Sequence, residues 1–247
     1  MRRLHPAPAE IDDVRAFVTE ADRPAPPGRP WLLVNMISSL DGAVTLDGRS
    51  GGLGRPADKA MLGALRSACD VVLVGAGTAR IEGYGPPRAA PEVRAARIER
   101  GQAEVPRLVV VSRSLAIDPA ARFLAEAEVP PVIVTCAGAP ADRRAALEPV
   151  AALLVAGDDD VDLPAALAEL ADDGVGTVCC EGGPELNGAL LAADLVDEWA
   201  LTLSPLLVGA GPGRAVAGAP VPDPAAFALS WVLEGDGLLL TRWLRAR

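Results

Sequence analysis

The chain reads Val178-Cys179-Cys180-Glu181-Gly182-Gly183-Pro184-Glu185-Leu186 at the point where an apolar run meets two glycines. The apolar residues are typical of the end of a buried strand, and Pro184 suits the first turn of a helix. The two glycines allow a ligand to approach backbone N–H groups, and the helix dipole favours an anion there. Because glycine pairs also occur for turn geometry alone, the stretch by itself only suggests a phosphate-binding turn.

Segments on both sides of this stretch alternate between strand and helix patterns. Before it, short apolar runs of the kind covered on both faces of a parallel sheet are separated by helical patterns. After a helix at 184–192, three successive strand patterns indicate an antiparallel end to a mixed sheet. The expected strands are 31–37, 71–74, 108–111, 132–135, 151–155, 178–181, 198–205, 226–233 and 237–244, and the expected helices are 9–20, 57–68, 141–147, 163–171 and 184–192, with a further helix possible after 75–79. An α/β fold is therefore predicted.

The chain shows no internal repeat and no convincing domain boundary. Its 247 residues are compatible with one domain or two. We predict a single domain over 1–247, in which 1–30 form an N-terminal helix and a stiff proline-rich connector. Residues 209–224, rich in Gly, Pro and Ala, are expected to form a surface loop.

Composition and charge exclude several classes of partner. Half of the residues are hydrophobic but only 3% are aromatic, so the core must consist mainly of Ala, Val and Leu. A formal net charge of −10 argues against nucleic acid and anionic membranes, since both are bound through clustered Lys and Arg. The start lacks the apolar region of a signal peptide, and no apolar run is long enough to span a bilayer. We therefore expect a cytoplasmic protein that holds any anionic ligand locally.

Residue types limit the chemistry further. His5 is the single histidine and lies among prolines near the N-terminus, so neither a His-dependent triad nor a zinc site with several His is expected. The four cysteines, Cys69, Cys136, Cys179 and Cys180, lack C-x-x-C spacing and are interpreted as small buried hydrophobes. No metal site is predicted. Carboxylates, lysine, hydroxyls, backbone donors and a bound cofactor remain.

Four loop segments at the ends of predicted strands are the candidate site. They are 35–42, which ends in Asp41-Gly42; 74–78, which reads Val-Gly-Ala-Gly-Thr; 112–114, which reads Ser-Arg-Ser; and 181–183. Each has a structural alternative, as a hairpin turn or a solvated strand end. The second is no dinucleotide fingerprint, because Arg80 stands where the third glycine belongs. Arg113 offers donors suited to a phosphate monoester. Four such segments together predict a nucleotide cofactor along one edge of the sheet.

The chain resembles the C-terminal reductase domain of the bifunctional riboflavin-biosynthesis deaminase/reductase. The matching segments are Ser39-Leu40-Asp41-Gly42, the run at 74–78, Glu181-Gly182-Gly183 and the Leu-Ser-Pro-Leu-Leu-Val-Gly run at 203–209. The resemblance implies the dihydrofolate-reductase-like fold, a three-layer α/β/α arrangement with a mostly parallel mixed sheet and antiparallel C-terminal strands. Since no zinc deaminase signature precedes these motifs, a stand-alone reductase is expected.

The resemblance also implies the activity and the roles of the site residues. The reaction is hydride transfer from NADPH to a pyrimidine or pteridine, in the first place the reduction of 5-amino-6-(5-phosphoribosylamino)uracil at the sugar C1′. Asp41 and Glu82 are the candidate catalytic acids. The implied cofactor-binding residues are Thr45, Gly75, Gly77, Thr78, Ser112, Arg113, Glu181, Gly182 and Gly183, and the implied substrate-binding residues are Asn35, Ser39 and Arg88. A homodimer is expected as well.

Departures from the family pattern keep other functions open. The riboflavin enzymes usually carry lysine where this chain has Asn35, and Asp-Asp-Pro or Asp-Asn-Pro where it has Glu82-Gly83-Tyr84. Both changes fall at the expected substrate pocket, so dihydrofolate is an alternative substrate. Two further alternatives are a nucleotide-binding regulatory protein without catalysis and a different nucleotide-dependent α/β enzyme, such as a transferase.

Three of the implied side chains also have ordinary structural interpretations. Asp41 can cap a turn, and Glu82 can be solvated. Arg88 can belong to an exposed basic face that includes Arg94 and Arg97.

Overall fold

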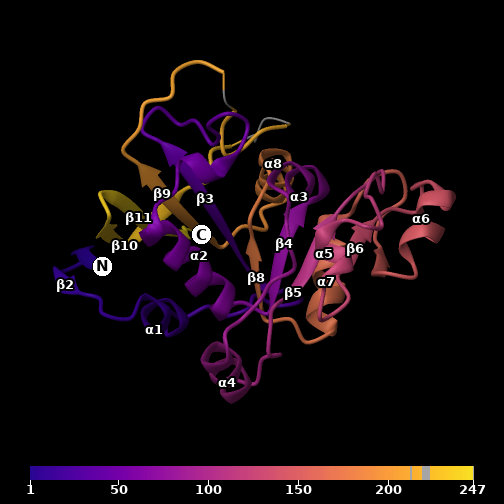
Figure 1. The fold of residues 1–247 in the computed structure, drawn as a ribbon, viewed down its shortest axis with the longest axis horizontal. Helices are drawn as coiled ribbons and strands as arrows, with labels where there is room; N and C mark the ends of the chain where they lie inside the picture. Colours follow the sequence, from indigo (N-terminus) through magenta and orange to yellow (C-terminus); the bar gives the residue numbers. More distant parts are fainter. Residues whose placement is uncertain (212, 219–222, 247) are drawn as a thin grey trace. The chain divides into compact units, whose positions relative to one another are not determined.

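The structure is a computed structural model and describes residues 1–211, 213–218 and 223–246 (Figure 1). The chain divides into two compact units. Unit 1 consists of Met1–Arg23, Leu32–Ala68 and Cys180–Arg247, and unit 2 consists of Pro24–Trp31 and Cys69–Cys179. The single domain expected from the sequence stays a prediction. Within the expected 209–224 loop, positions 212 and 219–222 lie outside the described residues.

Unit 2 is built on a sheet of short apolar strands in the order β8-β4-β5-β6-β7, and the pairs β4–β5, β5–β6 and β6–β7 are parallel. The strands are β4 (Val71–Gly75), β5 (Arg107–Val111), β6 (Val132–Thr135), β7 (Ala152–Val155) and β8 (Thr177–Cys180), and the helices are α3 (Ala76–Glu82), α4 (Pro91–Glu99), α5 (Arg122–Ala125), α6 (Ala141–Leu147) and α7 (Leu163–Asp172). The strands predicted for this part of the chain are therefore confirmed, within one or two residues at their ends.

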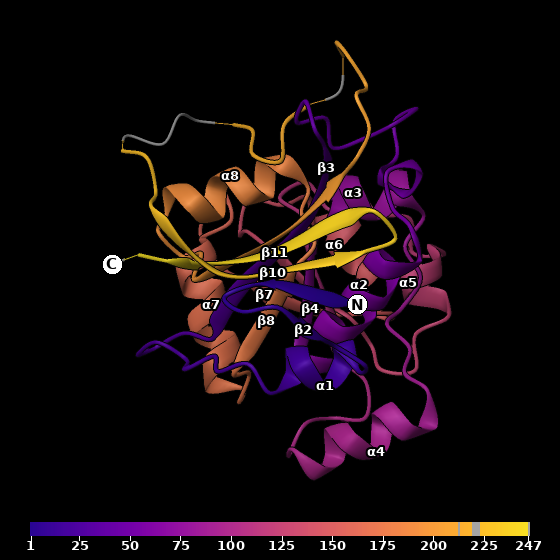
Figure 2. The same cartoon turned by 90° about the vertical axis from the view of Figure 1, so that its left-hand side faces the viewer.

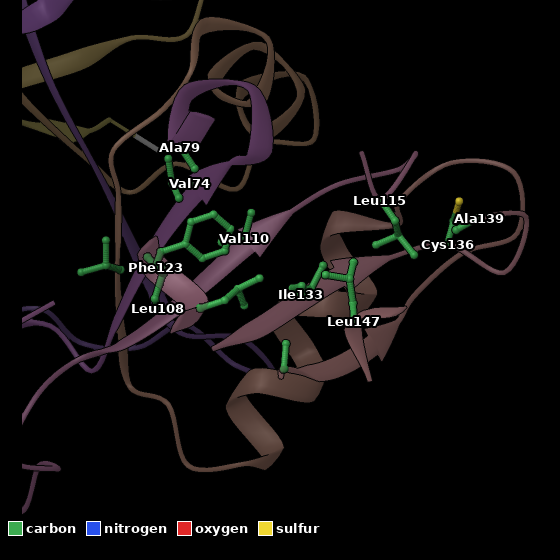
Figure 3. Packing of buried hydrophobic residues seen from close by; sticks show 13 residues of the cluster. Val74, Ala79, Leu108, Val110, Leu115, Phe123, Ile133, Cys136, Ala139 and Leu147 are labelled. Carbon is green, nitrogen blue, oxygen red and sulfur yellow. The ribbon is translucent and has the colours of Figure 1, made fainter. Parts of the chain in front are cut away.

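The sheet of unit 2 is covered on both faces. Alternate residues of three strands, among them Val74, Val110 and Ile133, pack in one cluster with Ala79 of α3 and Phe123 of α5 (Figure 3). The intervening residues of the same strands are buried too, with exposed fractions of 6% or less; they are Val71, Leu73, Val109, Val132 and Val134. Because successive side chains point to opposite faces, both faces are closed to solvent, as the continuous apolar runs predict.

Unit 1 carries the antiparallel strands, in the order β2-β1-β10-β11-β9-β3. Its strands are β1 (Arg2–His5), β2 (Ala9–Glu10), β3 (Trp31–Ser39), β9 (Glu198–Ser204), β10 (Phe227–Gly235) and β11 (Leu238–Arg245); its helices are α1 (Val14–Thr19), α2 (Pro56–Ala68), α8 (Pro184–Ala192) and the short 3₁₀ turn η1 (Ser50–Gly52). β3 runs parallel to β9, whereas β10 and β11 pair antiparallel along their length (Figure 2). The predicted α/β class with antiparallel C-terminal strands is confirmed.

The N-terminal region differs from the expected helix at 9–20. Residues 9–10 pair with β1, and the helix begins only at Val14. Asp13 explains this start, because its Oδ1 accepts hydrogen bonds from the backbone N–H groups of Arg15 at 2.8 Å and Ala16 at 3.1 Å. The sequence patterns also missed β1, α4 and α5. None of the helices among the described residues is long and apolar enough to cross a membrane.

A buried ion cluster joins distant segments of unit 1. The carboxylate of Glu198 on β9 accepts hydrogen bonds from Arg23 at 2.9 and 3.0 Å and from Arg242 on β11 at 2.9 Å. Glu198 is completely buried, and the two arginine side chains are 5% and 7% exposed. The cluster therefore fastens the segment after α1 to the C-terminal strands.

Candidate active site

Asp41 lies in a tight turn directly after β3 in unit 1. Its carboxylate accepts a hydrogen bond from the Ser39 hydroxyl and further bonds from the backbone N–H groups of Val208, at 3.1 and 3.2 Å, and Gly209, at 2.7 Å. Ser39 is 1% exposed, and its Oγ also accepts from the backbone N–H of Ala43 at 2.9 Å. The turn at the end of β3 therefore holds the loop that follows β9.

These donors change the acidity of Asp41. The hydrogen bond from Ser39, followed by those from Gly209 and Val208, lowers the pKa of Asp41 from its usual 3.8 to about 2. Hydrogen bonds to the charged form favour it, so the side chain is a carboxylate at neutral pH. In this arrangement Asp41 is suited to orienting neighbouring groups and is a poor proton donor.

Glu181 follows β8 and forms a bidentate pair with Arg66 in the last turns of α2. Arg66 Nε and Nη2 each lie 2.6 Å from one carboxylate oxygen of Glu181. The Glu181 side chain is only 4% exposed, whereas that of Arg66 is 31% exposed. A two-point pair of this kind fixes orientation as well as distance. Arg66 therefore anchors the residue that precedes the two glycines.

The Gly182–Gly183 turn leads directly into the N-terminus of α8, as expected from the sequence. Gly182 has φ +86°, and an added Cβ would lie 3.3 Å from Sδ of Met36 on β3. Gly183 is the N-cap of α8, which has Pro184 in its first turn and no side-chain cap. Since the first N–H groups of a helix have no partner within the helix, this terminus has the donor chemistry of an anion site.

Thr45 and Asn35 are the remaining predicted site residues in unit 1. Thr45 is half-buried in the loop after β3, next to Val44, whose N–H donates to the carbonyl of Gly213 at 3.3 Å. Asn35 is half-buried on β3, opposite Ala200 of β9. Asn35 and Ser39 are four residues apart on β3, so they share one face of that strand.

Unit 2 contains the second set of predicted residues. Gly75 ends β4 and caps α3 without a side-chain bond, and Gly77 and Thr78 lie in the first turn of that helix. Gly77 is exposed, and an added Cβ would meet nothing within 4 Å. Packing therefore does not explain this glycine. Glu82 ends the helix before Gly83, a left-handed residue with φ +65°.

Ser112 and Arg113 stand directly after β5, at the end of the strand that pairs with β4. Ser112 is 7% exposed. The Arg113 side chain is 67% exposed, and its Nη1 lies 3.9 Å from Oδ2 of Asp160. A second arginine lies close by, because Arg143 donates to the carbonyl of Ser114 at 2.9 Å. This strand end therefore presents a solvent-accessible guanidinium in a loosely held ion pair.

Arg88 lies in the loop between α3 and α4 of unit 2. Its guanidinium forms an exposed ion pair of 3.0 Å with Glu126, the residue that ends α5. The alternative interpretation, an exposed basic face shared with Arg94 and Arg97, is wrong for Arg97. Arg97 is 0% exposed and donates to the carbonyl oxygens of Cys69 at 2.7 Å and Ala103 at 2.8 Å. Its long side chain links α4 to the loop before β4.

The interpretation of the cysteines is confirmed. All four are buried, with exposed fractions of 1% or less. Burial raises the pKa of the Cys180 thiol to about 12, so this side chain is a neutral S–H group at physiological pH.

Within unit 1, the structure brings some predicted residues together and adds others. Ser39 and Asp41 are bonded to each other, and Gly182 lies beside β3 through Met36. Sequence reasoning missed Arg66 and also Asn187, a fully buried residue of α8. Arg66 offers no local signal, since its partner is 115 residues away. Asn187 did offer one, because an amide among the leucines of a buried helix face needs a hydrogen-bond partner.

Comparison with known proteins defines the class. The model of the family described as RibD C-terminal domain matches residues 30–233, a range that includes segments of both units. The chain therefore belongs to the RibD C-terminal domain family.

Two curated relatives are named 2,5-diamino-6-ribosylamino-4(3H)-pyrimidinone 5′-phosphate reductase. The one from Methanothermobacter thermautotrophicus is 31% identical over 186 residues, which cover 75% of this chain and 82% of the relative. The one from Archaeoglobus fulgidus is 29% identical over 182 residues, which cover 73% and 83%. Both alignments span most of a protein that is named as a reductase.

Solved structures show the same fold. A pyrimidine reductase-like protein from Corynebacterium diphtheriae superposes with a TM-score of 0.79 at 26% identity, covering 88% of this chain and 92% of that one. The riboflavin biosynthesis reductase Rib7 of Saccharomyces cerevisiae has a TM-score of 0.68 at 18% identity, covering 90% and 92%. The second likeness supports the fold alone.

Proposed function

We propose that this protein is an NADPH-dependent reductase of a ribosylaminopyrimidine 5′-phosphate in riboflavin biosynthesis. One observation carries the proposal: in this chain of the RibD C-terminal family, the glycine turn before α8 has no side-chain cap, and a two-point ion pair with Arg66 anchors the glutamate that precedes it. The names of the archaeal relatives favour the 2,5-diamino-pyrimidinone as substrate, a reaction related to reduction of the aminouracil.

Each unit offers residue types suited to part of a phosphorylated dinucleotide. In unit 1, Thr45, Gly182 and Gly183 would contact its nicotinamide half and pyrophosphate, with Glu181 holding the turn in place. The uncapped N–H groups at the start of α8 suit an anion. In unit 2, Gly75, Gly77 and Thr78 offer a second glycine-rich turn, and Ser112 with the exposed Arg113 would bind the adenosine 2′-phosphate. Bound NADPH supplies the hydride that adds to C1′ of the substrate imine.

The substrate-side residues divide into orienting groups and a proton donor. Reduction of the imine needs one proton on the amine nitrogen in addition to the hydride. Asp41, with a pKa of about 2, does not supply it, so Asp41 is proposed to orient the substrate and the 205–209 loop. Glu82 then remains as the proposed proton donor. Asn35 would contact the base or ribose, and Ser39, which is buried, would act by holding Asp41. Arg88 would bind the 5′-phosphate by exchanging its exposed pair with Glu126.

The test is a set of parallel assays on the purified chain. NADPH oxidation is followed with the 2,5-diamino-pyrimidinone phosphate, the 5-amino-uracil phosphate and dihydrofolate. We expect turnover with a ribosylaminopyrimidine phosphate and a larger thermal shift with NADPH than with NADH, since a ligand that binds the native state stabilises it. Turnover of dihydrofolate alone, or cofactor binding without turnover of any of the three, would refute the proposal.

A homodimer in the cytoplasm is part of the same proposal. Unit 1 exposes Leu4 on β1 and Leu239 on β11, at 37% and 39%. Exposed leucines on strands are compatible with an interface between copies of the chain. Sedimentation of the purified protein measures the association directly, and a monomer at micromolar concentration would exclude the dimer.

A further inference from the structure

Asn187 is a buried polar residue of α8, and its side chain has two hydrogen bonds. It is 0% exposed. Its Nδ2 donates to the carbonyl of Ala215 at 2.8 Å, and its Oδ1 accepts from Sγ of Cys180 at 3.5 Å. Burying an amide is unfavourable unless its donors and acceptors are bonded. Asn187 therefore joins the end of β8 to a segment 28 residues further along the chain.

The segment that Asn187 reaches, residues 213–218, lies across the start of α8, and we call it the strap. The backbone N–H of Ala217 donates to the carbonyl of Pro184 at 3.0 Å. Gly188 lies beneath the strap, because a Cβ at this position would come 1.8 Å from the carbonyl oxygen of Ala217. A third bond joins the strap to the loop after β3, from Val44 N–H to the carbonyl of Gly213 at 3.3 Å.

The same amide also borders the glycine turn. A Cβ on Gly182 would lie 3.5 Å from Nδ2 of Asn187 and 3.9 Å from its Oδ1. One side chain therefore touches the turn on one side and the strap on the other. Glycine in a helix costs about 1 kcal/mol relative to alanine, and Asn is also a poor helix former. Two such residues in succession, Asn187 and Gly188, are explained by the close approach of the strap.

We infer that Asn187 is a positioning residue for cofactor binding, which sets the Gly182–Gly183 turn by fastening the strap across the start of α8. The inference rests on the proposed function, in which this turn and Thr45 bind the cofactor. The strap bonds to Val44, the neighbour of Thr45, and to Pro184, the neighbour of Gly183. Releasing it therefore disturbs both predicted contacts and leaves Asp41 bonded to Val208 and Gly209.

Two variants release the strap by different routes. Asn187→Ala removes the amide, and Gly188→Ala inserts a methyl group where Ala217 approaches. Gly63→Ala is the matched control, because Gly63 is also helical, in α2, and an added Cβ there meets nothing within 4 Å. NADPH affinity, kcat and KM are measured for each, together with the melting temperature to establish folding.

The expected result is a selective loss of cofactor affinity. Each strap variant should bind NADPH about 5- to 30-fold more weakly, the size expected when a buried hydrogen bond is lost. Its kcat should change less than about threefold, because the substrate side is untouched. The double variant should lose little more than either single variant, since both release one segment. Gly63→Ala should bind NADPH as the parent protein does.

The outcomes separate the inference from the proposed function. Parent-like NADPH affinity in a folded Asn187→Ala protein would overturn the inference. If that variant does not fold, parent-like affinity in Gly188→Ala would overturn it. A fall in kcat without a change in affinity would overturn it too. Absence of NADPH binding to the parent protein would refute the proposed function, and the positioning role with it.

Discussion

Arg66 and Glu181 are joined by two parallel hydrogen bonds of 2.6 Å, one from Nε and one from Nη2 of the arginine. Arg66 comes from the last turns of α2, and Glu181 is the residue between β8 and the glycine turn. Two parallel bonds to one carboxylate fix the orientation of the Glu181 side chain relative to Arg66. The position of the glycine turn therefore depends on a helix that lies more than a hundred residues earlier in the chain.

Arg66→Ala should destabilise the protein and weaken NADPH binding together. Glu181 is nearly buried, and losing its partner leaves a poorly solvated carboxylate. We expect a loss of about 1–3 kcal/mol in the free energy of unfolding, because Arg66 itself is one-third exposed. Arg66→Lys should have a stability and an NADPH affinity between those of the parent protein and Arg66→Ala. Lysine keeps the positive charge but cannot form the two-point pair. Urea unfolding and NADPH titration measure both effects.

Lys59→Ala is the control for this prediction, because Lys59 is an exposed cation on the same helix. It should change the unfolding free energy by no more than about 0.5 kcal/mol. Equal stability of the Arg66→Ala and Lys59→Ala variants would show that the ion pair contributes nothing to the fold.

Arg113→Ala should reduce the preference for NADPH over NADH. Its guanidinium is exposed and only loosely paired with Asp160, so it is available to a phosphate. We expect NADPH to bind about 1.5–3 kcal/mol more weakly while NADH is unaffected, as for a charge-assisted bond. Titration of the variant with NADPH and with NADH measures both affinities. Equal losses of affinity for the two cofactors would contradict the proposal that Arg113 binds the 2′-phosphate.

Asp160→Asn should act in the opposite direction. Asp160 faces Arg113 at 3.9 Å, and a 2′-phosphate would have to compete with its charge. Removing that charge should tighten NADPH binding about two- to fivefold, which is the range of an exposed ion pair. The gain should shrink in high salt. Unchanged or weaker NADPH binding would place the 2′-phosphate away from Arg113.

Local patterns predicted most of the fold. The strands of unit 2 are apolar runs, and their buried faces follow directly from that composition. β1 is different, because its exposed residues gain their strand form from pairing with β10 at the far end of the sequence. The helix at 14–19 begins later than expected because the Asp13 cap outweighs the apolar spacing that starts at Ile11.

The candidate site was predictable only where a short motif carries it. Asp41 and the glycines stand at the ends of predicted strands, where the sequence places the candidate site. Arg66 acts through a partner 115 residues away, so no local pattern contains it. Asn187 stands out locally as an amide among leucines, but its partner 28 residues further along the chain does not. Ser39 was predicted as a substrate-binding residue of the same motif, whereas the structure shows its hydroxyl donating to Asp41 and its side chain almost closed to solvent.

Asp41→Asn should lower turnover about 10- to 100-fold with NADPH affinity nearly unchanged, as for the loss of an orienting group. The carboxylate holds Val208 and Gly209, and an amide cannot accept all of these bonds. With a pKa of about 2, Asp41 stays ionised through the working pH range. The pH profile of turnover should therefore keep its shape in the variant. Loss of an acidic limb in that profile would show that Asp41 titrates during the reaction.

Glu198→Gln should destabilise unit 1 in a pH-dependent way. Burial opposes ionisation of Glu198, but the charge of Arg23 and the bonds from Arg242 outweigh it, so its pKa is lowered from the usual 4.5. A lowered pKa in the folded state means that the ionised carboxylate stabilises the fold above pH 4.5, and that this stabilisation is lost as the pH falls through the lowered value.

At pH 7 we expect Glu198→Gln to cost about 3–5 kcal/mol, because it leaves two buried arginines without their counter-charge. The difference from the parent protein should narrow as the pH falls below 4.5, since the parent then loses the same charge. Urea unfolding between pH 7 and pH 3 measures this, with Glu169→Gln, an exposed position on α7, as the control. A difference that stays constant over this range would mean that the Glu198 charge does not stabilise the cluster.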